Sequence, residues 1–309
     1  MMTETFNVSR EDISALFPTL PERSNKGSCG RVLCVCGSYD PCGSAMSGAA
    51  YFAAAAAYRS GAGIVRIFTR RENYVPIASN LPEAVYSLYG GEENQNDIIS
   101  RLEDELAHVD SVVVGCGLGK SELSRRIVRT VLSFASCPLV IDADALNIIA
   151  EDGLWSLISK EQAARTVITP HMGEMSRLCG AEIKDILASP AEYAKELSRE
   201  RGVICLLKDH RTVITDGKTV YLNNSGNAGM ASAGMGDLLA GIIGAVISRK
   251  TVAEWADRER IGENELLYRA AVAAYLHGKA GDLAQARVGE YSLSSSDLLS
   301  DICNAIRAI

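Results

Sequence analysis

The stretch at residues 223–241, NNSGNAGMASAGMGDLLAG, has the composition of an anion-binding loop. Four glycines, at positions 226, 229, 234 and 236, come just before an apolar run that predicts a helix. Glycine lets the backbone approach a ligand closely, and the amino end of a helix presents unpaired N–H groups and a positive dipole. We therefore expect this loop to hold an anion such as a phosphate.

Asp237 stands at the predicted start of that helix, where its carboxylate has two alternative roles. It can cap the helix, because aspartate is a favoured N-cap residue. It can also take a proton from a hydroxyl that attacks a phosphate held in the loop. The residues of the loop alone leave both roles open.

Other polar or glycine-rich loops also follow predicted strands. GCGLGKS (115–121) comes one residue short of a P-loop and does not fit the dinucleotide-binding fingerprint. In TPHMGE (169–174), His171 can hydrogen-bond or transfer a proton, and Glu174 can bind a metal-held water or favour a helix start. In DADALN (142–147), the aspartates can serve magnesium, or Asp144 can cap a helix. The small residues of 37–49 allow either ligand contact or tight helix packing.

The elements that must position these loops alternate between strands and helices. Apolar runs of strand length, typical of a buried parallel sheet, are predicted at Arg31–Cys36, Gly63–Phe68, Ser111–Val114, Pro138–Ile141, Thr166–Thr169 and Val203–Leu207. Helical patterns lie between them at Ser47–Arg59, Asn96–His108, Ser121–Phe134 and Ala191–Glu200. This alternation predicts an α/β fold, in which loops at the carboxyl ends of the strands share one edge and bind ligands there.

In the last third of the chain, strands and helices no longer alternate. Thr212–Thr215 and Thr219–Leu222 flank Asp216-Gly217, which predicts a hairpin. Helices are predicted at Asp237–Ile247, Asn264–Ala286 and Ser296–Ile309. Because no linker or repeat divides the chain, we expect a less regular N-terminal arm over residues 1–25 and a single domain over 26–309.

Composition narrows the class of protein. The 309 residues are 47% hydrophobic and 22% charged, with a formal net charge of −7, which is typical of a globular protein and argues against nucleic-acid binding. The longest apolar runs are about ten residues, too short to span a membrane. The start of the chain has no signal pattern, and nine scattered cysteines suit a reducing compartment. We therefore expect a cytoplasmic location and no membrane contact.

Taken together, several segments resemble one family, the ADP/ATP-dependent NAD(P)H-hydrate dehydratases of the ribokinase-like superfamily. The matching segments follow the family order and are KGSCGRVLCVCGS (26–38), GAAYFAAAAAYRSGAGIVRIFT (48–69), GCGLGKS (115–121), IDADALN (141–147), TPHMGE (169–174), LLKDHRTVI (206–214) and NAGMASAGMGDLLAGII (227–243). The last segment alone indicates only the superfamily, whereas KGSCGRV, YRSGAG and TPHMGE point to the dehydratases.

The resemblance implies a central, mainly parallel sheet of about eight strands with helices on both faces. It also implies a lyase that repairs the hydrated S epimer of NADH or NADPH. ADP, or ATP, phosphorylates the ring hydroxyl, and elimination of phosphate restores the reduced dinucleotide. The alternative is a ribokinase-like kinase that phosphorylates a vitamin or sugar hydroxyl and stops there, which TPHMGE disfavours.

The resemblance also assigns roles to single residues. Asp237 would be the catalytic base and would contact the substrate, and the N–H groups of residues 233–236 would stabilise the phosphoryl group in transfer. Further contacts with the hydrated dinucleotide would come from Ala49, Gly117, Gly119, His171 and Asn227. The adenine nucleotide would be held by Lys208, Asp209, His210, Arg211, Thr212, Gly234 and Gly236. Glu174 would lie near Mg²⁺.

One departure from the family concerns the nucleotide loop. The family usually has glycine after the lysine, whereas this chain has Asp209, whose charge we expect to weaken phosphate binding. The resemblance further implies a homo-oligomer, a tetramer. Many relatives carry an N-terminal epimerase domain, and residues 1–25 are too few for one, so we expect a separate epimerase to act on the same metabolite.

Overall fold

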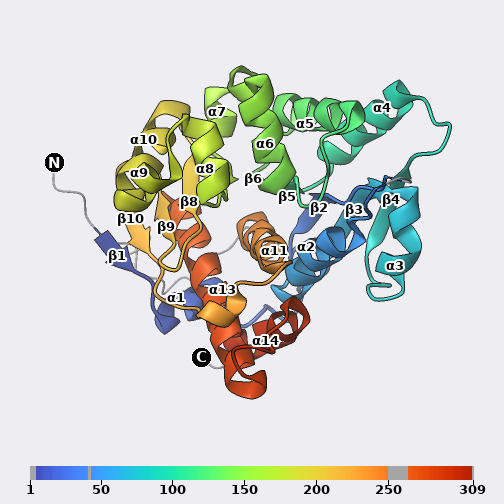
Figure 1. Cartoon of the computed structure of the whole chain (residues 1–309). Helices are drawn as coiled ribbons and strands as arrows, with labels where there is room; N and C mark the ends of the chain where they lie inside the picture. Colours follow the sequence, from blue (N-terminus) through green and yellow to red (C-terminus); the bar gives the residue numbers. More distant parts are fainter. Residues whose placement is uncertain (1–4, 41–42, 250–263, 308–309) are drawn as a thin grey trace.

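The computed structural model describes residues 5–40, 43–249 and 264–307 and shows a sheet with layers of helices on both faces (Figure 1). Within these residues ten strands form the sheet in the order β1-β10-β9-β8-β7-β6-β5-β2-β3-β4. Their bounds are β1 Thr5–Asn7, β2 Arg31–Val35, β3 Ile64–Arg70, β4 Val85–Tyr89, β5 Ser111–Val114, β6 Leu139–Ile141, β7 Thr166–Ile168, β8 Ile204–Leu207, β9 Val213–Thr215 and β10 Val220–Leu222.

The sheet is mainly parallel, as expected, but has ten strands rather than about eight. β9 runs antiparallel to both β8 and β10, while the other described pairings are parallel. The predicted hairpin at Asp216-Gly217 joins β9 to β10, and β1 adds a further edge strand against β10. β4 at the opposite edge is a strand that the apolar runs did not reveal, because Val85 is exposed and the following residues alternate between half-buried and buried.

The helices form two layers. Their bounds are α1 Arg10–Leu16, α2 Ser47–Arg59, α3 Tyr74–Ala78, α4 Gln95–Leu106, α5 Glu122–Phe134, α6 Ala143–Asp152, α7 Lys160–Ala163, α8 Met172–Cys179, α9 Ile183–Ala188, α10 Pro190–Arg201, α11 Met235–Ser248, α13 Glu265–Val288 and α14 Ser295–Arg307, with short 3₁₀ turns at Arg71–Asn73, Leu154–Leu157 and Ala228–Met230. Helices α2, α11, α13 and α14 lie on one side of the sheet, and α4, α5 and α6 lie on the other (Figure 1).

Each face of the sheet packs into its own hydrophobic core, because successive side chains of a strand point to opposite faces. On β2, Val32 and Cys34 belong to the core with α2 and α11, whereas Leu33 and Val35 belong to the core with α4 and α5. All four side chains are fully buried. The continuously apolar runs of the sequence are therefore central strands covered on both sides.

Two glycines seat α11 against the sheet and against α2. A Cβ at Gly241 would lie 2.1 Å from the carbonyl oxygen of Ala53 on α2, and one at Gly244 would lie 2.4 Å from Cγ2 of Val113 on β5. No larger residue fits at either position without movement of its neighbours. This close packing places the amino end of α11 at the carboxyl ends of the central strands, where α/β proteins bind ligands.

The predicted elements are found, and their observed bounds differ from the predicted ones by at most two residues. The helix predicted to begin at Asp237 begins two residues earlier, at Met235. Residues 308 and 309, which the last predicted helix included, lie outside the described residues, as do residues 1–4 of the predicted arm. The rest of that arm is more regular than expected, since it contributes β1 to the sheet and forms α1. In the part of the chain that the structure describes, none of the helices combines the length and apolar character that crossing a membrane requires.

Candidate active site

The amino end of α11 is a bare backbone surface. Its N-cap residue is Gly234, which has a φ of 90° and no side chain to accept hydrogen bonds from the first turn. The first N–H groups of a helix have no partner within the helix, and here they point along its axis beyond Met235. A Cβ at Gly234 would lie 2.9 Å from the ring of Phe52, so glycine is required for space as well as for φ. The backbone N–H groups of the first turn are thus uncapped by any side chain at the predicted loop, and its binding of an anion stays a prediction.

Asp237 lies in the first turn of α11 rather than at its cap. Because Gly234 occupies the N-cap position, the interpretation of Asp237 as a capping residue is wrong. Burial, and then the neighbouring carboxylate of Asp142, raise the pKa of Asp237 to about 6. A carboxyl group with this pKa exchanges its proton close to neutral pH, which suits a general base.

Asp142 and Cys116 are the closest acidic and thiol neighbours of Asp237. One oxygen of each aspartate and Sγ of Cys116 all lie within 4.8 Å of one another. The pKa of the Cys116 thiol is raised, first by the hydrogen bond that Cys116 makes with Cys36 and then by burial. The thiol therefore stays protonated. The cluster consequently offers two carboxylates and a neutral thiol, and the two carboxylates suit a hard cation such as Mg²⁺.

Lys208 balances the charge of Asp142. Its Nζ donates to Oδ1 of Asp142 at 2.7 Å and lies 3.9 Å from Oε2 of Glu174. The hydroxyl of Thr169 donates to the same Asp142 oxygen at 2.7 Å. Burial opposes the charged form of Lys208, but Asp142 and Glu174 outweigh it, so its pKa is raised and it remains an ammonium ion. A Cβ at Gly236 would lie 3.5 Å from Nζ, which places this charge beside the tip of α11.

The backbone around Asp142 is shaped by its neighbours. A Cβ at Gly115 would lie 1.9 Å from the carbonyl oxygen of Asp142, so only glycine fits after β5. Ala143, which follows Asp142, has a φ of 49°, and no other non-glycine residue in the described part of the chain has a positive φ. Such strain is found where the surrounding structure holds a functional group in place.

His171 and Glu174 cap the start of α8. Nδ1 of His171 accepts from the N–H groups of Gly173 and Glu174 at 3.0 and 3.4 Å, and Oε2 of Glu174 accepts from the His171 N–H at 2.9 Å. Nδ1 is therefore the acceptor nitrogen, and Nε2 carries the proton. Burial and the charges of Lys208 and Arg177 lower the pKa of His171. The ring is thus a neutral donor near the ion pair of Lys208 and Asp142. The backbones of His171 and Lys208 are joined by an isolated parallel β-bridge.

Gly117, Gly119 and Ala49 lie together, as the predicted substrate contacts require. A Cβ at Gly117 would lie 2.8 Å from Cβ of Ala49, and one at Gly119 would lie 3.3 Å from the side chain of Ser38. The N–H of Gly37 donates to the carbonyl oxygen of Cys116 at 2.9 Å, which joins the loops after β2 and β5. β2 has β5 on one side and β3 on the other, so the order of the sheet reverses here and a crevice is expected.

Residues 209–212 form an exposed turn between β8 and β9. The side chain of Asp209 accepts from the N–H of His210 at 2.8 Å, and the hydroxyl of Thr212 donates to the carbonyl oxygen of Asp209 at 3.1 Å. Asp209 does not have a positive φ, so the aspartate introduces no backbone strain where the family usually has glycine. Its effect is one of charge alone.

The structure does not bring the side chain of Asn227 into this cluster. Its Nδ2 donates to Asp282 at 3.2 Å, and its Oδ1 accepts from the N–H of Gly229 at 3.1 Å. The Nδ2 end thus ties the glycine loop to α13, and the Oδ1 end braces the loop itself. A contact between this side chain and substrate would require these bonds to break.

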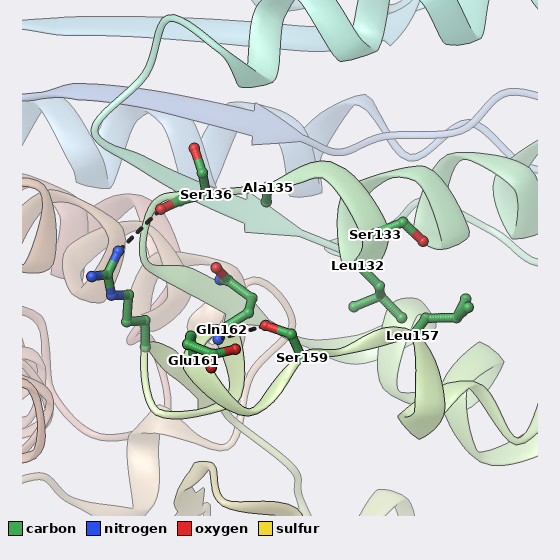
Figure 2. Close-up of a pocket in the computed structure, with 9 residues that line it drawn as sticks. Leu132, Ser133, Ala135, Ser136, Leu157, Ser159, Glu161 and Gln162 are labelled. Atoms are coloured by element: carbon green, nitrogen blue, oxygen red, sulfur yellow. Dashed lines mark hydrogen bonds between the residues drawn. The ribbon is translucent and has the colours of Figure 1, made fainter.

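A cavity of about 300 Å³ lies at the opposite edge of the sheet. Its walls come from the end of α5 and from the residues that precede β7 (Figure 2). The N–H of Gln162 donates to the Ser159 hydroxyl at 3.1 Å (Figure 2), and Arg165 donates to the carbonyl oxygen of Ser136 at 3.3 Å, so these polar groups satisfy one another. This cavity faces the amino ends of the strands, away from Asp237.

Thr169 is a site residue that the sequence did not single out, and Asp142 was named only as a candidate for magnesium, not as the partner of a lysine. Asp142 appeared only as one of two aspartates after a predicted strand, and Thr169 as the last residue of another. Their positions at the ends of β6 and β7 were the available signal, since neighbouring parallel strands end at the same edge. Asp144, the other aspartate, accepts from the N–H of Gly119 at 2.7 Å and so supports the glycine loop.

Comparison with known families gives one match that spans most of the chain. The family described as NAD(P)H-hydrate dehydratase matches residues 32–304. Among curated proteins, the ADP-dependent (S)-NAD(P)H-hydrate dehydratase of Lactiplantibacillus plantarum is 34% identical over 78% of this chain and 81% of its own length. The bifunctional NAD(P)H-hydrate repair enzyme of Escherichia coli is 34% identical over 97% of this chain. The chain spans 52% of that relative's length.

The fold also matches solved structures. The ADP/ATP-dependent NAD(P)H-hydrate dehydratase of Bacillus subtilis, co-crystallised with ATP and Mg²⁺, superimposes with a TM-score of 0.76 and 27% identity over 97% of both chains. A ribokinase-like superfamily protein from Enterococcus faecalis gives a TM-score of 0.80 at 24% identity, covering 98% of this chain and 96% of that one. The second likeness concerns the fold alone, and it agrees with the ribokinase-like fold that the sequence predicts.

Proposed function

The chain belongs to the NAD(P)H-hydrate dehydratase family, and from this premise we propose that it dehydrates the hydrated S epimers of NADH and NADPH at the expense of ADP. The ring hydroxyl attacks the terminal phosphoryl group of ADP, and AMP leaves. Loss of phosphate from the ring then restores the reduced nicotinamide. The observation that carries the proposal is the carboxyl of Asp237, with a pKa of about 6, in the first turn of a helix whose tip presents bare N–H groups.

Asp237 takes the proton of the attacking hydroxyl in this proposal. An ordinary aspartate is a weaker base for this task, because its pKa lies further below that of the hydroxyl. Burial and the charge of Asp142 make Asp237 a stronger base while leaving it mostly ionised at neutral pH. General-base assistance of this kind contributes about 10²–10⁴-fold to a rate.

The phosphoryl group in transfer is stabilised from two directions. The N–H groups at the tip of α11, following Gly234 and including that of Gly236, donate to its oxygens. The ammonium of Lys208, fixed by Asp142, supplies a positive charge on the same side. The exposed turn formed by Asp209, His210, Arg211 and Thr212 then holds the rest of the adenine nucleotide, next to the strand that carries Lys208.

The substrate lies on the other side of Asp237. Ala49, Gly117 and Gly119 offer a surface of small residues at the crevice between β2 and β5, and His171 offers Nε2–H as a donor. Asn227 bonds Asp282 of α13 through its side chain and contacts the substrate through its backbone.

Mg²⁺ accompanies the nucleotide in this proposal. Asp142 offers an oxygen donor of the kind that Mg²⁺ prefers, and the ion would neutralise charge on the phosphates, while Asp237 keeps its carboxylate for the proton of the hydroxyl. Glu174, which the resemblance places near the ion, is held by the α8 cap and faces Lys208, so its role is to adjust the charge around the ion, in contact with it only through water.

The proposal also covers the setting in which the enzyme works. The eight described cysteines all carry free thiols, which supports a reducing, cytoplasmic location. We further propose a homo-oligomer, a tetramer, and a separate epimerase that converts the other epimer of the hydrate. Light scattering at several protein concentrations tests the oligomer.

Incubation with hydrated NADH, ADP and Mg²⁺ tests the reaction. We expect the absorbance of the reduced ring to return with one AMP and one phosphate formed per dinucleotide. Omitting ADP, or replacing Asp237 with asparagine, provides the control. A phosphorylated product without recovery of absorbance would identify a kinase instead and overturn the dehydratase assignment.

A further inference from the structure

A second cavity, of about 500 Å³, opens next to Gly119. Its volume lies within the range of small-molecule sites. The lining comes from the loop after β2, the ends of β3 and β4, and the start of α5, and includes Ser38, Asp40, Arg70, Tyr89, Lys120 and Ser121. These elements lie at the carboxyl edge of the β5-β2-β3-β4 half of the sheet, away from β8 and its nucleotide turn (Figure 1).

Arg70 is the central cation of this cavity, and part of its hydrogen-bonding capacity is unused. Its Nε is buried and finds no hydrogen-bond partner among the described residues, since the nearest carboxylate, that of Glu72, is 3.7 Å away. The guanidinium carbon lies 5.8 Å from the ring centroid of Tyr89, which in turn stacks on Phe68 at 4.8 Å. The arginine side chain, which is 27% exposed, is therefore held in place, and its guanidinium brings to the cavity a positive charge that Glu72 at 3.7 Å offsets only in part.

Two further features make the cavity favourable for an anion. Lys120 pairs with Glu151 at 2.6 Å in a cluster where three cations, Lys120, Arg125 and Arg129, face two carboxylates, Glu151 and Asp152, so one positive charge is left uncompensated within the cluster. The 13-residue helix α5 begins after Ser121, and its positive end faces the same space. The lining also includes the carboxylate of Asp40 and the hydroxyls of Ser38 and Ser121.

The cavity continues from the surface on which the substrate ring is proposed to lie. Gly119 belongs to both, and the side chain of Ser38 lies 3.3 Å from the place where a Gly119 Cβ would be. A dinucleotide with its hydrated ring beside Ala49 and Asp237 has a second half, which carries the pyrophosphate and a ribose. That half needs an extended site with cations and hydroxyl acceptors, as this cavity provides.

We propose that this cavity binds the pyrophosphate-bearing adenylate arm of the dinucleotide, with Arg70 and Lys120 contacting its phosphate oxygens. The inference rests on the proposed function and deepens it, since it makes Arg70 a residue that selects a whole dinucleotide over a free nicotinamide nucleoside. The ring and the nucleotide that phosphorylates it then bind on opposite sides of Asp237.

Binding of NAD⁺ to the intact protein, measured by calorimetry with the nucleotide site saturated by ADP and Mg²⁺, tests the inference without turnover. We expect Arg70→Ala to weaken NAD⁺ binding about 10- to 100-fold and Lys120→Ala about 3- to 10-fold, because charge-assisted hydrogen bonds to phosphate are lost. Arg70→Lys should recover only part of the affinity, since it restores the charge but not the planar fork of donors. Affinity for ADP itself should not change.

Arg66→Ala and Arg126→Ala are matched controls, because Arg66 lies on the same strand but pairs with Glu105, and Arg126 lies on α5 but contacts Gln95 and Asn96. Both should bind NAD⁺ like the wild type. If Arg70→Ala binds NAD⁺ as tightly as the controls, the cavity assignment is wrong. If the wild type binds NAD⁺ through Arg70 but never turns over the hydrate, the cavity stands and the proposed reaction fails.

Discussion

Nζ of Lys208 lies 2.7 Å from Oδ1 of Asp142, and this ion pair links two loops that are 66 residues apart in sequence. Lys208 follows β8 and Asp142 follows β6, with β7 between them. The pair therefore spans two strand spacings at the carboxyl edge of the sheet. It fixes a positive charge beside Gly236, where the phosphoryl group is proposed to pass.

Replacing Lys208 by methionine should therefore harm both stability and activity. Asp142 is 2% exposed, and the loss of its cation leaves a buried charge that keeps only neutral donors, the Thr169 hydroxyl at 2.7 Å and the Cys116 thiol at 3.7 Å, among the described residues. We expect the free energy of unfolding to fall by about 3 kcal/mol at neutral pH, as measured by urea denaturation. Lys279→Met, which removes an exposed pair with Asp282, should cost less than about 1 kcal/mol. Equal effects of the two substitutions would contradict the buried-pair argument.

Asp237→Asn should abolish most of the activity while leaving the fold intact. Asparagine has the same shape but cannot accept the proton, so kcat should fall about 10²–10⁴-fold with little change in the KM for ADP. Steady-state kinetics and circular dichroism measure the two properties. Retention of kcat in a well-folded variant would remove Asp237 from the role of base.

The pH dependence of the rate should follow the ionisation of the same carboxyl. With a pKa of about 6, Asp237 becomes protonated as the pH falls through that value, so kcat/KM for the hydrated dinucleotide should decrease about tenfold for each unit of pH below 6. An ordinary aspartate, with a pKa near 3.8, would leave the rate unchanged down to about pH 5. A flat profile between pH 5 and 7 would exclude the raised pKa.

Stability should change with pH in the opposite sense to that of an ordinary ion-paired carboxylate. Because folding raises the pKa of Asp237, its protonated form is favoured in the folded protein, and this contribution is lost as the pH rises through about 6. Asp237→Asn carries no such charge, so it should be more stable than the wild type at pH 8, relative to pH 4, by about 1–3 kcal/mol. A stability difference that does not vary between these two pH values would refute this.

Gly234→Ala tests the bare tip of α11. The residue has a φ of 90°, and its Cβ would press on Phe52, so we expect a loss of stability of about 1–2 kcal/mol and a large loss of kcat through displacement of the tip. Gly153→Ala is the matched control, because Gly153 has a φ of 66° but nothing within 4 Å of the added methyl. It should lose stability and keep its activity, so loss of activity in both variants would point to general destabilisation.

Much of this architecture could be predicted locally. The strand at Ser111–Val114 and the helix at Ser47–Arg59 have the predicted bounds. An unbroken apolar run predicts the strand, and an alanine-rich stretch predicts the helix. The hairpin at Asp216-Gly217 follows from its turn residues. β1 was missed because three residues carry no periodicity, and β4 because half of its side chains face outward at the sheet edge.

The candidate site divides in the same way. The order of glycines before an apolar helix determined that a phosphate loop would precede α11, since φ and helix polarity are properties of neighbouring residues. Only the tertiary structure decided that Gly234 caps that helix and that Asp142 and Lys208 pair beside Asp237. It also decided that the side chain of Arg70 lines the cavity next to Gly119. These relationships depend on which strand ends adjoin, and strand order is set by packing between segments far apart in the chain.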